Sequence, residues 1–134
     1  MRAHQFVIAG ILALGVATPA LAATTTGYGK GGKTKEFATE VERQQASGEL
    51  MRIKGHCQSA CTMFLAVKNS CVEPSARLLF HAGNTPEATS RMFNSYNSSL
   101  RAYLSARGAM NSKAFHTVSG ADMINKFGYR ACPK

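Results

Sequence analysis

The sequence predicts an α/β protein with a small, mainly parallel sheet and flanking helices. Stretches with helical spacing of apolar residues alternate with short extended stretches, in the order helix, strand, helix, strand, helix. Helices placed between strands form crossover connections, which join parallel strands. Neither an internal repeat nor a second domain is indicated. We therefore expect a single domain over residues 34–134, after a leader over residues 23–33.

The first 22 residues have the features of a secretory signal peptide. Arg2 and His4 begin a short basic region, residues 6–16 are apolar, and Ala20-Leu21-Ala22 fits a small-x-small cleavage site. The apolar run is too short for a convincing membrane span. We therefore expect an exported protein, periplasmic in a bacterium or secreted, with no integral membrane segment after cleavage.

The first half of the mature chain divides at glycines. Residues 23–33 are small, polar and glycine-rich, which favours a loop or a flexible leader. Thr34 can cap a helix that runs to about Ala46. Residues 50–54 alternate enough for a short strand that ends before Gly55. Residues 60–67 are almost all apolar and predict a buried helix.

The second half begins with two short extended pieces, at residues 71–72 and 76–81, separated by Pro74. One long helix is then predicted over residues 86–107. Its apolar residues recur every three or four positions, a pattern typical of core packing: Met92, Phe93, Tyr96, Leu100, Tyr103 and Leu104. Two short helices should follow, one capped by Ser112 and one capped by Ser119 that closes at Gly128.

The chain contains four cysteines, Cys57, Cys61, Cys71 and Cys132. An even number in an exported protein predicts two disulfides, and the sequence leaves all three pairings open. A metal site built from Cys57, Cys61, His56 and His81 is the alternative. It lacks the Cys-x-x-Cys pair that such sites commonly have, so we expect no metal and no cofactor.

The composition is basic, with 16 Lys and Arg against 7 Asp and Glu and a net charge of +9. Such a balance favours acidic partners in a general way. The basic residues are scattered, however, and no basic motif interleaved with aromatic residues is present. We therefore expect a solvated positive surface and no nucleic-acid partner.

The candidate chemistry lies between Gly55 and His81. Ser59 stands at the start of the apolar helix, and His81 closes the strand that follows. A hydroxyl at a helix N-terminus and an imidazole are the minimum for nucleophilic catalysis. Each residue also has a structural interpretation: Ser59 as a helix cap, and His81 as a core-edge histidine bonded to the backbone. The motif is not Gly-x-Ser-x-Gly, which disfavours an α/β-hydrolase.

Together these segments resemble a known family. Gly55-His56-Cys57-Gln58-Ser59-Ala60, followed by the apolar helix and by Pro74-Ser75-Ala76-Arg77-Leu78-Leu79-Phe80-His81, is similar to the Clp protease proteolytic subunit in the crotonase-like superfamily. Closer still are small exported bacterial proteins that carry a Cys-x-Ser-Ala-Cys motif on this fold. The resemblance covers about residues 27–130, and it implies a reduced Clp-protease-like fold.

The resemblance implies a serine hydrolase or peptidase. Ser59 would be the nucleophile and His81 the general base. The oxyanion hole would use the N–H of Gly31 or Gly32 and that of Ala60, which suits unpaired N–H groups at a helix start. A peptide or another acyl compound would be the substrate, and no cofactor is required.

Two departures from the family pattern favour other functions. The third catalytic residue of the family is an aspartate, but Phe115 and His116 stand at its place. Asp122 is better explained as a capping partner of Ser119. The strands that precede the glycine pair in the family are also missing. One alternative is therefore an inactive, disulfide-stabilised binding module. A weaker one is a cationic protein that associates with acidic envelope polymers. The oligomeric state stays open.

Overall fold

The computed structural model describes residues 10–15 and 23–134 of the chain. Most of the predicted signal peptide, including Ala20-Leu21-Ala22, lies outside these residues. The described elements, with η marking a 3₁₀ helix, are β1 (Ala23–Thr24), α1 (Thr34–Ser47), β2 (Met51–Ile53), β3 (His56–Gln58), η1 (Ser59–Ala66), β4 (Ser70–Val72), β5 (Arg77–Phe80), α2 (Pro86–Phe93), α3 (Ser98–Ala106), η2 (Ala109–Asn111), β6 (His116–Ser119) and α4 (Gly120–Asn125).

The strands form two small sheets, which confirms the predicted α/β class. One sheet has the order β1-β2-β4 and is parallel throughout. The other has the order β3-β5-β6, in which β3 and β5 are parallel and β5 and β6 antiparallel. The chain passes from the first sheet to the second at Gly55, whose φ of 65° suits glycine. The carbonyl of Gly55 accepts the N–H of Arg77.

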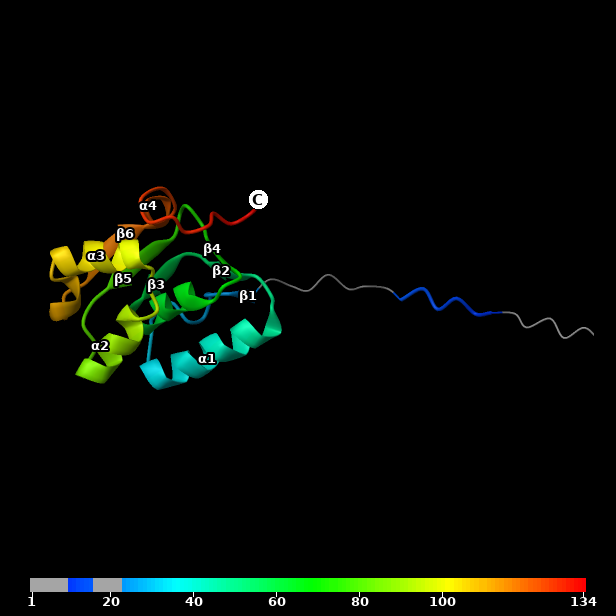
Figure 1. The fold of residues 1–134 in the computed structure, drawn as a ribbon, viewed down its shortest axis with the longest axis horizontal. Helices are drawn as coiled ribbons and strands as arrows, with labels where there is room; N and C mark the ends of the chain where they lie inside the picture. The colour runs from blue at the N-terminus through cyan, green and yellow to red at the C-terminus, as the bar shows by residue number, and fades with distance from the viewer. Residues whose placement is uncertain (1–9, 16–22) are drawn as a thin grey trace, which may run out of the picture.

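The apolar segment η1 occupies the centre of the molecule. Its residues from Ala60 to Leu65 are buried, and it packs against α1, α2 and strands of both sheets. Figure 1 shows this short helix between the strands and α1, with α3, β6 and α4 on the side of the molecule opposite α1. Phe64 also meets Tyr28 and Phe37 edge to face. The predicted buried helix is therefore present, and its 3₁₀ form is the difference.

The N-terminal part of the domain differs from the prediction. Residues 23–33, expected to be a loop or flexible leader, contain β1, which pairs with β2. Thr25 is buried, and its hydroxyl donates to the carbonyl of Lys54 and accepts the Lys54 N–H. Two residues are too few to show strand periodicity in a sequence. The helix cap also differs, because Lys33 occupies the N-cap position and Thr34 is the first helical residue.

The predicted helix over 86–107 is two helices, α2 and α3. The turn between them buries Tyr96, and Asn97 caps α3 by accepting the N–H of Leu100. The apolar spacing continues across the break, so the periodicity did not indicate it. The helix predicted at Ser112 is also absent, because residues 116–119 form β6 instead. The Ser119 cap is confirmed: its Oγ accepts the N–H of Asp122.

Both predicted disulfides are present. Cys57 is bonded to Cys61 on either side of Ser59, and Cys71 is bonded to Cys132 near the end of the chain. The Cys57–Cys61 bond leaves neither sulfur as a thiolate, which removes the alternative metal site. No helix in the described ranges is both long and apolar enough to cross a bilayer.

We predict that the two disulfides differ in their contribution to stability. The Cys71–Cys132 bond spans 61 residues and the Cys57–Cys61 bond spans four. Loop-closure entropy gives about 4 kcal/mol for the longer loop and about 2 kcal/mol for the shorter. Urea unfolding of the two double Cys→Ala variants measures both losses. A larger loss for the Cys57–Cys61 pair would contradict the entropic account.

Candidate active site

The serine turn is the most constrained point of the backbone. Ser59 has a φ of 56°, in the left-handed region that residues with a side chain rarely adopt. A conformation of this kind costs about 1–3 kcal/mol and persists only where the surroundings enforce it. The Cys57–Cys61 disulfide brackets the turn and both its sulfurs are buried. The sequence therefore places the serine between two fixed points.

A buried chain of hydroxyl groups supports the same turn from behind. The Thr62 hydroxyl lies 2.6 Å from the Ser59 carbonyl oxygen and 2.6 Å from the Tyr96 hydroxyl. Burial of the Tyr96 phenol, partly opposed by its bond to Thr62, raises its pKa well above the ordinary tyrosine value. Tyr96 therefore stays neutral across the physiological pH range and can donate its proton to Thr62.

The glycine pair lies directly against the serine. A Cβ atom at Gly31 would lie 2.8 Å from the Gln58 carbonyl oxygen and 3.0 Å from the Ser59 Cβ, so only glycine fits there. Gly31 also has a φ of 73°. Its N–H donates to the carbonyl of Tyr28 at 3.0 Å and is already engaged. Of the three expected oxyanion donors, the N–H groups of Gly32 and Ala60 are the ones not engaged in this hydrogen bond to Tyr28.

The imidazole of His81 is oriented by a backbone carbonyl. Its Nδ1 lies 3.3 Å from the Lys113 carbonyl oxygen, and its ring packs against Phe115 at 4.6 Å between centroids. The other ring nitrogen, Nε2, is buried and has no hydrogen-bond partner. When Nδ1 carries the proton and donates a hydrogen bond to the Lys113 carbonyl, Nε2 presents a lone pair as an acceptor.

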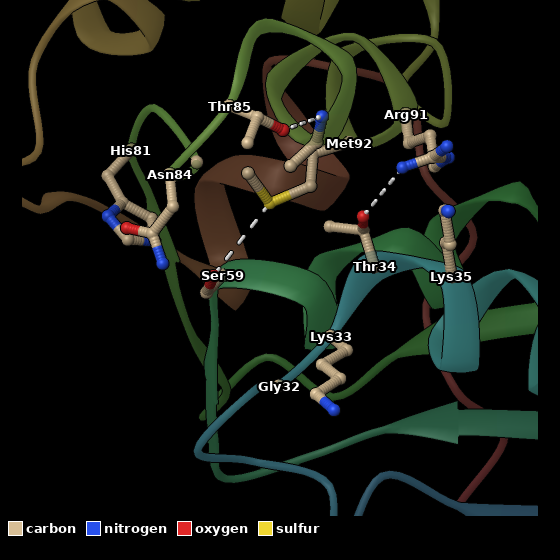
Figure 2. Close-up of a pocket in the computed structure, with 12 residues that line it drawn as sticks. Gly32, Lys33, Thr34, Lys35, Ser59, His81, Asn84, Thr85, Arg91 and Met92 are labelled. Atoms are coloured by element: carbon tan, nitrogen blue, oxygen red, sulfur yellow. Dashed lines mark hydrogen bonds between the residues drawn. The ribbon is translucent and has the colours of Figure 1, made fainter.

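One cavity holds both predicted catalytic residues. It has a volume of about 510 Å³ and its wall comprises Gly32, Lys33, Thr34, Lys35, Ser59, His81, Gly83, Asn84, Thr85, Ala88, Arg91 and Met92. Figure 2 shows Ser59 and His81 on one side of this cavity. The Ser59 hydroxyl contacts the Met92 Sδ at 3.8 Å and is not hydrogen-bonded to His81. The structure therefore places Ser59 and His81 in one cavity, with no hydrogen bond between their side chains.

At the place where the family has its aspartate, this chain has Phe115 and His116, and neither supplies a negative charge behind His81. Phe115 packs on the ring, and His116 Nε2 is paired with the Tyr103 hydroxyl. Asp122 is ion-paired with Lys126 on α4 and does not line the cavity. Within residues 10–15 and 23–134, no group of three or more His, Cys, Asp or Glu residues is arranged to hold a metal.

The sequence prediction missed one wall of the cavity. It assigned Met92 only to a core stripe, and it gave Thr85 and Arg91 no role. Thr85 caps α2 by accepting the N–H of Ala88, and Pro86 occupies the first turn of the helix. A Thr-Pro helix start a few residues after the candidate base was the available indication that α2 begins beside His81.

We predict that Gly31→Ala disturbs the serine turn, whereas Gly48→Ala does not. Both glycines are left-handed, with φ of 73° and 69°, so both substitutions carry a similar backbone cost. Only at Gly31 would the new methyl group meet Ser59. The Gly31 variant should lose about 1 kcal/mol or more beyond the Gly48 variant in urea unfolding. Equal losses would contradict the packing argument.

We predict that Tyr96 destabilises the fold at alkaline pH. Burial holds the pKa of Tyr96 in the folded protein above the value near 10 expected in the unfolded chain. The contribution of Tyr96 to the free energy of unfolding is therefore complete below pH 10 and falls as the pH rises above it. The slope for one proton is at most about 1.4 kcal/mol per pH unit. Tyr96→Phe should lower stability at pH 7 by about 1 kcal/mol and flatten the alkaline slope. Tyr129, whose pKa burial also raises, would supply a residual slope. Unfolding of both proteins from pH 8 to 11 tests this, and parallel curves would contradict it.

Comparisons with known proteins do not assign a family. No family model, curated protein or solved structure matches the chain. The likeness to the Clp protease subunit therefore stays an expectation from the motifs at Ser59 and His81.

Proposed function

We propose that the chain is a serine hydrolase that uses a Ser59–His81 dyad on a peptide or another acyl substrate. One observation carries the proposal: Ser59 and His81 line the same cavity, and the buried Nε2 of His81 has no partner. A buried acceptor without a hydrogen bond is unfavourable by about 1–3 kcal/mol. The Ser59 hydroxyl is a donor in that cavity, and pairing with it would remove the penalty.

The reaction needs the Ser59 hydroxyl to leave Met92 Sδ and to donate to His81 Nε2. Catalytic hydrogen bonds that are long or absent in the unliganded enzyme and form with the substrate are common. Ser59 Oγ then forms a bond to the substrate carbonyl carbon while its proton passes to Nε2. The carbonyl π electrons move to oxygen, which becomes the oxyanion.

The second half of the reaction returns the proton. The bond to the leaving group breaks, and that group takes the proton from Nε2, which leaves an acyl ester on Ser59. Water then attacks the ester, with His81 again accepting a proton and passing it to Ser59 Oγ. The N–H groups of Ala60 and Gly32 are the proposed oxyanion donors, since that of Gly31 is bonded to Tyr28.

We infer that the protein acts after export. Two disulfides are typical of a non-reducing, extracytoplasmic compartment. The basic, apolar and small-residue segments of the first 22 residues agree with a signal peptide. The resemblance of the Ser59 and His81 motifs to those of the Clp protease subunit supports the same roles for these two residues. The family's aspartate has no counterpart at the expected place, where Phe115 and His116 stand.

We predict labelling of the mature protein by a fluorophosphonate at Ser59. Ser59→Ala should abolish labelling, and His81→Ala should slow it by about a hundredfold or more because it removes the base. His56→Ala is the matched control: His56 is exposed, its side chain pairs with Gln58, and it lies outside the cavity, so the labelling rate should be unchanged. Gel-based labelling between pH 6 and 9 measures all four rates. The absence of Ser59-dependent labelling would overturn the proposal.

An inactive binding module is the second candidate, and the contact of Ser59 with Met92 favours it. A hydroxyl in contact with a thioether, and a histidine whose Nδ1 faces a neutral backbone carbonyl, also describe a cavity that only binds. On that view Ser59→Ala leaves ligand affinity unchanged and no acyl-enzyme forms. Mass spectrometry of the protein after incubation with an activated ester separates the two candidates.

A further inference from the structure

We propose that the acyl substrate carries a carboxylate and that Arg91 and Lys35 bind it. The inference deepens the proposed function, because it describes the substrate of the Ser59–His81 cavity. The residues that line the cavity include three with cationic side chains, Lys33, Lys35 and Arg91, and none with an acidic one. The Lys33 side chain points away from the other two (Figure 2), which leaves Lys35 and Arg91 as the cations of the site. A binding site with this charge selects an anionic group.

Arg91 is the central cation of the group. It comes from α2, is half-buried, and donates from Nη1 to the Thr34 hydroxyl at 3.3 Å. Figure 2 shows Arg91, Thr34 and Lys35 together on the side of the cavity opposite Ser59 and His81. A guanidinium has five N–H donors in a fixed fork, so the bond to Thr34 leaves donors for a carboxylate, which it can bind with two parallel hydrogen bonds.

The cations lack an internal counter-ion. Among the residues that the structure describes, neither Lys33, Lys35 nor Arg91 forms a salt bridge. Glu36 and Glu87 lie in the first turns of α1 and α2, but neither lines the cavity. Lys33 and Lys35 also stand at the N-terminus of α1, where the helix dipole disfavours positive charge. A bound anion would offset both unfavourable terms.

The size and lining of the cavity favour a carboxylate on a short acyl chain. About 510 Å³ is in the range of small-ligand sites. Met92 and Ala88 provide apolar surface in the wall. A substrate can thus place its carbonyl at Ser59, its methylene groups along Met92, and its carboxylate at Arg91. In a peptide, the carboxylate comes either from an Asp or Glu side chain or from the free C-terminus.

Matched peptides distinguish these two sources. Four short peptides of one sequence would carry Glu or Gln at the last position, each with a free or an amidated C-terminus. Affinity for the Ser59→Ala protein is measured by calorimetry, so that no turnover occurs. We expect at least one carboxylate to strengthen binding about tenfold or more, as is usual for a charge-assisted hydrogen bond. Added salt should weaken that binding.

Variants locate the site. Arg91→Gln and Lys35→Gln should each remove most of the preference for the carboxylate, while Arg91→Lys should retain part of it. Lys68→Gln is the control, because it removes the same charge from an exposed residue that lies outside the cavity. Circular dichroism would verify that the variants are folded. Equal affinity for all four peptides, or an equal loss in Lys68→Gln, would overturn the inference.

The outcome is separable from that of the proposed function. Fluorophosphonate labelling of Ser59 without any preference for a carboxylate would retain the hydrolase and reject this substrate. A preference for the carboxylate that depends on Arg91, without labelling, would reject the hydrolase and retain an anion-binding cavity.

Discussion

The fold and the candidate site both depend on how the chain turns between β3 and η1. At that turn Ser59 has a left-handed backbone, and four separate features hold it there. The disulfide closes across it, Thr62 binds its carbonyl, the chain at Gly31 fits against it, and Gln58 is tied to Gly29 and Lys30. A strained conformation that is enforced from several directions is typical of functional sites. The N-cap interpretation of Ser59 does not require such support, because a cap has extended backbone angles.

The histidine is held by weaker means. A carboxylate behind an imidazole fixes the tautomer and also stabilises the positive charge that forms during catalysis. The carbonyl of Lys113 can do the first, since it accepts a hydrogen bond from the Nδ1–H group, but it carries no full charge. Phe115 packs on the ring and limits its rotation, without any electrostatic contribution to the imidazolium. The Lys113 carbonyl and Phe115 thus hold the imidazole without supplying a counter-charge.

Local chemistry determined which parts of this arrangement the sequence could predict. Periodicity located α1, β2 and β5 to within a few residues, and the helix-start residue Ser119 located α4. The two disulfides followed from the even number of cysteines. β1 was missed because two residues show no alternation, and it forms only through backbone bonds to β2. The break at Tyr96 was missed because its side chain keeps the apolar spacing of the helices on either side.

The cavity wall could not be predicted, because it depends on the approach of α2 to α1. The bond between Arg91 and Thr34 joins residues 57 positions apart, and nothing in either segment indicates it. The same approach sets Arg91 and Lys35 across the cavity from Ser59 and His81 (Figure 2). The two sides of the cavity therefore differ in chemistry: one carries a hydroxyl and an imidazole, and the other carries two cations that form no salt bridge with any residue that the structure describes. An acyl substrate with a carboxylate would match both sides at once. The packing of α2 on α1 thus decides which substrates the proposed dyad could accept.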